Sequence, residues 1–197
     1  MHISTLRRLI IFSTLLVVSL AGCIRANNQI PTASTLPSPV TPQIQPTSTP
    51  AGIPGTSCIP AQKPEKAELL SVIDGDTIVV TFPGSSQRYN VRFIGIDTPE
   101  TYPEAEYFGF EAYKANKALL GSGPVYLFKD ISNTDKYGRL LRYIVVGDTF
   151  VNYELANRGY ANVFSYPPDV ACHKVLLDAQ RSARENGRGL WSPTPAP

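Results

Sequence analysis

Apolar and polar positions follow a regular order only from about residue 65 onward in this 197-residue chain. Residues 65–82 contain two apolar runs separated by Asp74-Gly75. Because Asp-Gly between apolar runs is a hairpin signal, this segment predicts two strands joined by a turn. Residues 89–96 predict a third strand, in which Val91 and Phe93 share one face.

The remaining pattern predicts three helices and further strands. In residues 104–120, apolar residues recur every three or four positions, as they do on one face of a helix. Gly121 and Gly123 end that helix, since glycine favours helix C-termini. Short strands with a helix between the third and fourth indicate a small, strongly bent barrel. The later elements are a strand at 124–128, a hairpin at 140–151 turning at Gly147-Asp148, a short helix at 151–157 and a last helix at 169–185.

The start of the chain has the pattern of an export signal. Two arginines precede an apolar run over residues 9–21, which is shorter than the about 20 apolar residues that a membrane-spanning helix needs. The run ends in Gly22-Cys23, which resembles a bacterial lipobox. We therefore expect a lipoprotein-type signal peptide over residues 1–22 and a lipid on Cys23. The alternative is a plain signal peptide cleaved nearby.

The next segment has the composition of a linker. Proline occupies nine positions between residues 24 and 64, interleaved with Thr, Ser and Gln and without any acidic residue. Such a stretch buries too little apolar surface to offset the entropy lost on folding. We therefore expect a lipid anchor and linker over residues 23–64, one folded domain over 65–192 and a disordered tail over 193–197.

Charge argues against a generally basic nucleic-acid-binding surface. The chain carries a formal charge of +2, but four of its basic residues precede residue 65. From residue 65 onward, fourteen basic residues face sixteen acidic ones, which gives a net charge of −2. A nucleic-acid function must therefore depend on a local site rather than on overall attraction.

Cysteine usage fits an exported protein. With Cys23 lipidated, Cys58 and Cys172 remain as an even pair in an oxidising compartment. The sequence leaves two interpretations open, because it does not show that the two residues are close in space. They either form a disulfide or are two unrelated thiols.

Three short segments carry groups suited to phosphodiester chemistry. They are Asp74-Gly75-Asp76-Thr77, residues 92–100 (RFIGIDTPE) and residues 134–139 (TDKYGR). Together they supply hard oxygen ligands for a cation, one further carboxylate and two arginines. Each segment alone also fits an ordinary turn or helix start, so the combination carries the interpretation.

In order and spacing these segments resemble the signature of the thermonuclease family, the staphylococcal-nuclease-like enzymes, over about residues 65–192. The resemblance implies a mainly β (α+β) fold, a five-stranded OB-type barrel with three helices. It also implies a Ca²⁺ site formed by Asp76, Asp97 and the backbone carbonyl of Thr98. Zinc is not expected, because His173 is the one histidine after the signal and the sequence has no Cys/His cluster.

The resemblance further assigns catalytic roles. Glu100 lies beside the metal and orients or deprotonates a water; which of the two stays open. Arg92 binds the scissile phosphate, and Arg139 stabilises the transition state and the leaving group. Arg88 and Arg142 match nothing in the motif and are expected to be solvated or paired.

Substrate contacts are assigned in the same way. Lys136 and Tyr137 match family residues beside the nucleotide, where an aromatic face stacks on any base. The family has a Tyr-x-Tyr pair where this chain has Phe164-Ser165-Tyr166. Tyr166 takes one of those roles, and the other has no matching tyrosine.

The expected protein is a monomeric Ca²⁺-dependent endonuclease. It is expected to hydrolyse DNA and RNA with little sequence preference and to prefer single strands. The resemblance implies that it leaves 3′-phosphate ends. Its expected location is the outer face of the cell membrane through the lipid on Cys23, or else secreted or periplasmic. One alternative is a non-catalytic nucleic-acid-binding OB module on a surface lipoprotein, against which Arg92, Glu100 and Arg139 count. Another is an adhesion or scaffold module.

Overall fold

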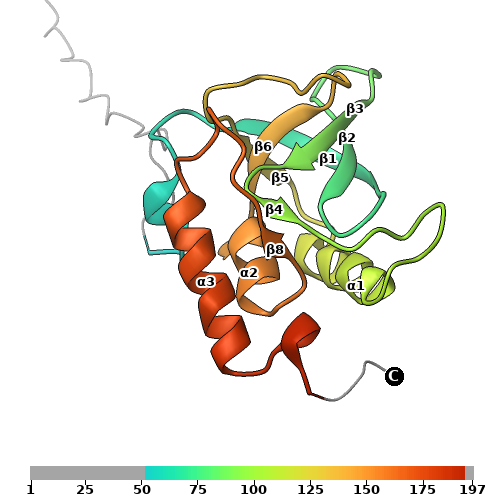
Figure 1. Cartoon of the computed structure of the whole chain (residues 1–197). Coiled ribbons are helices and arrows are strands. Elements are labelled where there is room, and N and C mark those ends of the chain that lie inside the picture. Colours follow the sequence, from blue (N-terminus) through green and yellow to red (C-terminus); the bar gives the residue numbers. More distant parts are fainter. Residues whose placement is uncertain (1–51, 194–197) are drawn as a thin grey trace, which may run out of the picture. The chain divides into compact units, whose positions relative to one another are not determined.

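The computed structural model describes residues 52–193, whose elements are coloured along the chain in Figure 1. The expected signal peptide, Cys23, most of the linker and residues 194–197 of the tail lie outside the described residues. Between residues 52 and 193, no helix combines the length and apolar character needed to cross a bilayer.

Five strands form a closed barrel. Their order is β3-β2-β1-β5-β6, with antiparallel neighbours, and a parallel pairing of β3 with β6 closes the barrel. This confirms the expected five-stranded OB-type barrel with three helices. The strands are β1 (Glu65–Val72), β2 (Thr77–Thr81), β3 (Tyr89–Phe93), β5 (Val125–Phe128) and β6 (Leu140–Val146), and β7 (Thr149–Phe150) extends the sheet beside β6.

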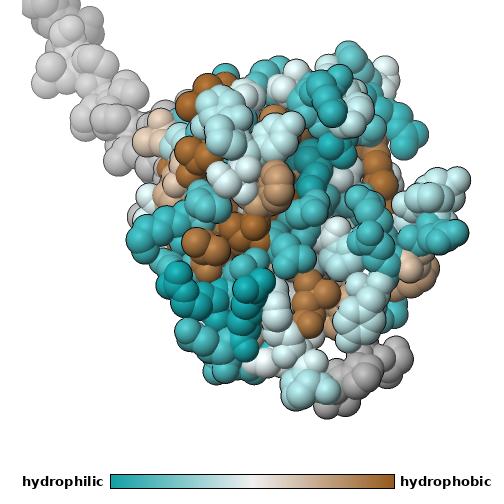
Figure 2. All heavy atoms as spheres, in the orientation of Figure 1, coloured by the Kyte–Doolittle hydropathy of each residue, from teal (hydrophilic) through white to brown (hydrophobic). Residues whose placement is uncertain are grey.

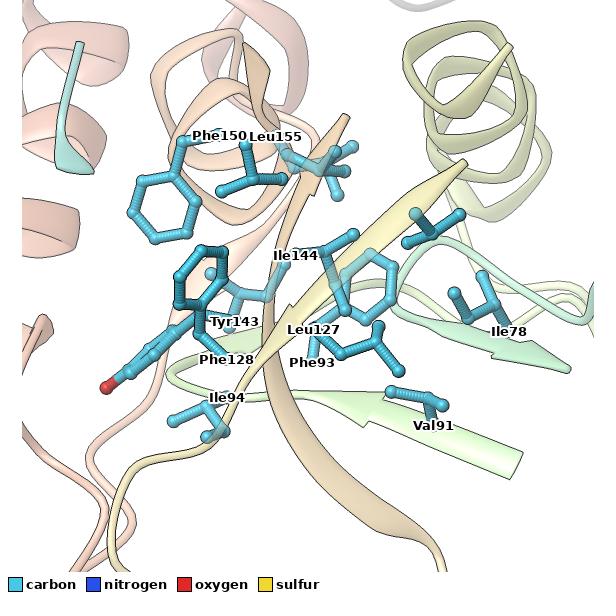
Figure 3. Packing of buried hydrophobic residues seen from close by; sticks show 14 of the residues in the cluster. Ile78, Val91, Phe93, Ile94, Leu127, Phe128, Tyr143, Ile144, Phe150 and Leu155 are labelled. Atoms are coloured by element: carbon cyan, nitrogen blue, oxygen red, sulfur yellow. The ribbon is translucent and has the colours of Figure 1, made fainter. Parts of the chain in front are cut away.

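The core fills the barrel interior. Figure 3 shows Ile78, Val91, Phe93, Leu127 and Ile144 pointing into the space between the strands. All five are buried, as expected where alternate side chains of each strand face inward. The face seen in Figure 2 is mainly hydrophilic, and hydrophobic residues appear there in small separate groups.

Three helices pack against the barrel. They are α1 (Gly109–Leu120), α2 (Val151–Asn157) and α3 (His173–Glu185), and α2 contacts both other helices and β6. Asn152 of α2 accepts a hydrogen bond from Ile144 N and donates one to Ile94 O, each of 2.9 Å. A buried amide thus ties α2 to the turn that follows β3.

The third strand ends earlier than its pattern predicts. The expected strand at 89–96 stops at Phe93, and Gly95 (φ 80°) turns the chain into β4 (Ile96–Asp97). β4 pairs with β8 (Asn162–Val163), a strand that the sequence analysis did not expect. The positive φ of Gly95 is a conformation that other residues rarely adopt, so the turn favours glycine there.

Two helices begin later than predicted. The first was expected from residue 104 but begins at Gly109, because residues 98–108 form a loop. The last was expected from residue 169 but begins at His173. Asp169 instead accepts hydrogen bonds from Ile131 N (2.9 Å) and Ser132 N (2.7 Å), which holds residues 166–171 against another loop.

Packed structure also begins before the expected boundary at residue 65. A short 3₁₀ helix spans Thr56–Cys58, and Thr56 and Ile59 are buried. Cys58 is joined to Cys172 by a disulfide with a Cα–Cα distance of 4.9 Å. The end of the expected linker is therefore attached at the start of α3. A second 3₁₀ helix, Gly189–Trp191, follows α3.

Candidate active site

A cavity of about 310 Å³ opens where the β3–β4 turn, the loop before β6 and the segment after β8 meet. Figure 1 shows β4 and β8 side by side next to the end of β3. Three of its lining residues are the cationic Arg92, Lys136 and Arg139. Its aromatic lining includes Tyr137, Phe164 and Tyr166.

Arg92 projects from β3 toward two carboxylates. Its Nη1 lies 2.6 Å from Asp76 Oδ2 and donates to Ile96 O at 2.9 Å, and its Nη2 lies 2.6 Å from Asp97 Oδ1. The Arg92 side chain is 18% exposed. A planar donor fork is therefore held at the edge of the cavity in a defined orientation.

Asp76 is the buried member of this group. Its Oδ2 also accepts from Thr98 N (2.8 Å) and Thr98 Oγ1 (3.0 Å). Burial raises the pKa of Asp76 to about 7; Arg92 opposes this shift, and the nearby charge of Asp74 adds to it. Asp76 and Asp97 thus share the Arg92 guanidinium as their ion-pair partner.

The turn between β1 and β2 fixes Asp76. Asp74 Oδ1 accepts from Asp76 N at 2.9 Å, and Asn116 Nδ2 of α1 donates to Asp74 O at 3.0 Å. A Cβ on Gly75 would lie 2.6 Å from Thr98 Oγ1, so only glycine lets the turn approach Thr98 this closely. Asp74 thus orients the turn through its own side chain and backbone.

The donors around Arg92 fit a hard cation. Asp76, directly before β2, and Asp97, at the end of β4, offer carboxylate oxygens of the kind that Ca²⁺ prefers, and the Thr98 carbonyl is a third oxygen next to Asp97 in sequence. Between residues 52 and 193, no three or more His, Cys, Asp or Glu side chains converge as a metal-binding group. The three expected donors are all oxygens, a type of ligand that suits Ca²⁺ rather than zinc.

Glu100 follows Thr98 at the start of the loop before α1. Burial raises the pKa of its carboxyl, as do the charges of Asp74, Asp97 and Glu106, while Arg92 lowers it. The pKa of Glu100 therefore responds to the same charged residues, although Glu100 is exposed and does not line the cavity. Its raised pKa makes it a better proton acceptor than an ordinary glutamate.

Arg139 reaches the cavity from a separate loop. Its Nε donates to Asp135 Oδ2 at 2.7 Å, and Asp135 Oδ1 accepts from the backbone N–H groups of Tyr137 and Arg139 at 2.9 Å each. Burial raises the pKa of Asp135, but the hydrogen bonds from Arg139 and Tyr137 outweigh it and hold the pKa below its ordinary value. Asp135 therefore organises the whole turn that presents Arg139.

The remaining predicted contacts line the cavity as an exposed aromatic wall. Lys136 Nζ lies 4.9 Å and Arg139 Cζ 5.5 Å from the ring centre of Tyr137. The rings of Phe164 and Tyr166 lie 6.4 Å apart. Phe164 is 57% exposed and stands two positions before Tyr166, so this part of the cavity has an aromatic face without a hydroxyl.

The sequence analysis missed three residues of the site. Phe164 was noted only as a departure from the family pattern, and Asp169 was expected to start a helix. Asp135 was not assigned, although an acidic residue four positions before an arginine is a pairing signal. Arg142, expected to be solvated or paired, is buried and paired with Glu65 at 2.7 Å.

Comparison with known proteins identifies the family. Thermonuclease of Staphylococcus intermedius is 37% identical over 123 residues, or 61% of this chain and 72% of that protein. Thermonuclease of Staphylococcus hyicus is 36% identical over 128 residues, which are 64% of this chain and 75% of that protein. The SPbeta prophage-derived endonuclease YokF of Bacillus subtilis is 36% identical over 125 residues, which are 61% of this chain and 42% of that protein. Residues 90–193 match the family described as staphylococcal nuclease homologue, and the chain belongs to that family.

Proposed function

We propose that this protein is a Ca²⁺-dependent endonuclease that hydrolyses phosphodiester bonds in DNA and RNA. The observation that carries the proposal is that Arg92 and Arg139, from separate segments, line one cavity beside a carboxylate group and an aromatic wall. Similarity to proteins named thermonuclease and endonuclease supports it.

The arginines have distinct roles in the proposed reaction. A water oxygen attacks phosphorus and the bond to the 5′-oxygen breaks, which leaves a 3′-phosphate. Arg92 holds the non-bridging oxygens, and Arg139 stabilises the charge that grows on those oxygens and on the leaving group. When bound by Asp76, Asp97 and the Thr98 carbonyl, Ca²⁺ supplies positive charge at the phosphate and lowers the pKa of water.

Glu100 accepts the proton of the attacking water in this proposal. Its raised pKa and its position among Asp74, Arg92 and Asp97 suit that role. The 5′-oxygen that leaves takes a proton from solvent.

The aromatic wall supports binding of unpaired strands. Tyr137, Phe164 and Tyr166 present exposed rings to the cavity, and stacking on a ring requires a splayed base. Lys136 adds a positive charge beside Tyr137 for a neighbouring phosphate. We therefore propose single-stranded DNA and RNA as the preferred substrates, cut with little dependence on sequence.

Location and assembly belong to the same proposal. The lipobox-like Gly22-Cys23 supports a lipid anchor on Cys23, with the nuclease held outside the membrane as a monomer on a proline-rich linker. The disulfide between Cys58 and Cys172 supports an oxidising compartment. Fractionation of intact cells and of cells expressing Cys23→Ser tests this: release of active protein only from the variant is expected, and a wild-type protein that is already soluble contradicts it.

The decisive experiment is digestion of single-stranded DNA with Ca²⁺ or with excess chelator. Activity should require Ca²⁺, and Arg139→Ala should lower kcat by roughly 10³–10⁵-fold, as for charge-stabilising arginines in phosphoryl transfer. Arg88→Ala is the matched control, because Arg88 is exposed and does not line the cavity. Full activity in chelator, or DNA binding without any hydrolysis, contradicts the proposal.

A further inference from the structure

Glu106 forms a reciprocal pair of hydrogen bonds with the backbone of Glu100. Glu100 N donates to Glu106 Oε2 at 3.0 Å, and Glu106 N donates to Glu100 O at 2.9 Å. In Figure 1 the loop that contains both residues runs outward from β4 and returns to the start of α1. The two hydrogen bonds close this loop upon itself next to Glu100.

The first residue of α1 also packs against the backbone of Glu100. Gly109 N donates to Glu106 O at 3.0 Å, and a Cβ on Gly109 would lie 2.3 Å from Glu100 O. Any other residue at position 109 would therefore push the Glu100 peptide away. The first residue of α1 is a glycine because the helix starts directly against Glu100.

Phe108, between these two contacts, has a left-handed backbone conformation (φ 72°). This conformation is uncommon for a bulky residue and persists only where the surroundings enforce it. The Phe108 ring stacks on Tyr160 with a centroid distance of 5.6 Å and an interplanar angle of 24°. The turn that returns the chain to Glu100 is thus anchored to the segment between α2 and β8.

The side chain of Glu100 depends on this backbone for its position. Among the residues that the structure describes, it has no hydrogen-bond or ion-pair partner. Asp76 and Arg139, by contrast, are each fixed by their own side-chain hydrogen bonds. Displacement of the Glu100 peptide would therefore move the carboxylate directly.

We propose that Glu106 is a positioning residue, which fixes the backbone of Glu100 and so aims its carboxylate at the attacking water. The inference rests on the proposed function, in which Glu100 accepts the proton. The hydrogen bond from Glu100 N needs only an acceptor oxygen, so the role does not require the charge of Glu106.

The test compares Glu106→Ala, Glu106→Gln and Glu104→Ala in the full-length protein. Ala removes the acceptor, whereas Gln keeps an acceptor oxygen and removes only the charge. Glu104 is a matched control, because it is exposed in the same loop and has no hydrogen bond or ion pair with the described residues. The readouts are kcat and KM on single-stranded DNA, Ca²⁺ affinity by calorimetry, and amide exchange of the non-proline residues between 100 and 108.

Glu106→Ala should lower kcat by about tenfold or more, because a reacting group misplaced by a fraction of an ångström loses rate of that order. KM and Ca²⁺ affinity should stay within about twofold of wild type. Glu106→Gln should retain most of kcat, and Glu104→Ala should match wild type. The Glu100 amide should exchange faster in Glu106→Ala and remain protected in Glu106→Gln.

Two results would overturn the inference. One is a Glu106→Ala variant with wild-type kcat and a protected Glu100 amide. The other is an equal loss of kcat in Glu106→Gln and Glu106→Ala, which would assign the effect to charge. If the wild-type protein itself does not hydrolyse DNA, the proposed function fails, and the amide exchange still shows whether Glu106 holds Glu100.

Discussion

Asp135 Oδ2 accepts a hydrogen bond of 2.7 Å from Arg139 Nε within the loop that precedes β6. The other oxygen of the same carboxylate accepts two backbone N–H groups of that loop. One residue therefore sets the backbone of the turn and the direction of the arginine that it presents. An arginine so restrained loses little conformational freedom when it binds a phosphate.

Replacement of Asp135 should therefore impair catalysis without removing Arg139. We expect Asp135→Ala to lower kcat on single-stranded DNA by about 10²-fold, because the guanidinium is no longer aimed. Asp135→Asn should lie between Ala and wild type, since its amide oxygen still accepts the backbone N–H groups. Steady-state kinetics on folded variants checks this, and a kcat for Asp135→Ala within threefold of wild type would contradict it.

The same carboxylate should make stability depend on pH. Its pKa is lowered in the folded protein from an ordinary value of 3.8, so the ionised form is the one that folding favours. The contribution of the ionised Asp135 carboxylate to folding stability is therefore complete above pH 3.8. It is lost as the pH falls through the lower pKa of the folded protein.

Urea unfolding of wild type and Asp135→Asn over a range of pH measures this effect. At pH 6 the variant should be less stable by about 1–2 kcal/mol, the difference between a hydrogen bond to a charged group and an ordinary hydrogen bond. The difference should shrink toward zero in acid. A difference that is independent of pH would assign the effect to something other than ionisation of Asp135.

Asp76 should be required for Ca²⁺ binding. Asp76→Ala removes a carboxylate that lies 2.6 Å from Arg92. We expect Ca²⁺ affinity to fall by at least about tenfold, because loss of a residue that only hydrogen-bonds to a metal ligand already has an effect of that size. Calorimetric titration with Ca²⁺ measures it. Asp148→Ala, in the exposed turn after β6, removes an equal charge elsewhere and should leave affinity unchanged.

Phe164 should contribute to substrate binding and not to chemistry. Stacking of a base on an aromatic ring is worth about 1–3 kcal/mol, so Phe164→Ala should raise KM about tenfold with little change in kcat. Phe164→Tyr keeps the ring and should bind at least as well as wild type. Phe110→Ala is the control, because Phe110 is similarly exposed but lies on α1 outside the cavity. Equal KM values for the Phe164 and Phe110 alanine variants would contradict the assignment.

The barrel was predictable because its strands follow simple local rules. Buried Val91 and Phe93 alternate with more exposed residues along β3, and Asp74-Gly75 marks the turn before β2. The start of the first helix could not be predicted, because it is set by a tertiary contact and not by a local rule. Phe108 continues the helical spacing of α1, yet its packing on Tyr160 holds it in a left-handed conformation outside the helix.

The site could be predicted only in part, because its geometry depends on contacts between segments that are distant in the sequence. Arg92, Asp76 and Asp97 could be selected from their motif, but their pairing around one guanidinium depends on how β2, β3 and β4 meet. Contacts between segments distant in sequence, such as Asp169 with residues 131–132, leave no local periodic signal. Spatial contacts of this kind appear only once the barrel has closed.

The disulfide between Cys58 and Cys172 should account for a large part of the stability. It closes a loop with a sequence separation of 114 residues, and constraint of the unfolded chain by such a loop is worth roughly 4–5 kcal/mol. Urea unfolding with and without reductant should show a loss of this order. A Cys58→Ser, Cys172→Ser double variant should be destabilised equally and be indifferent to reductant. Wild-type stability that is unchanged by reductant, or two free thiols in the unreduced denatured protein, would contradict the prediction.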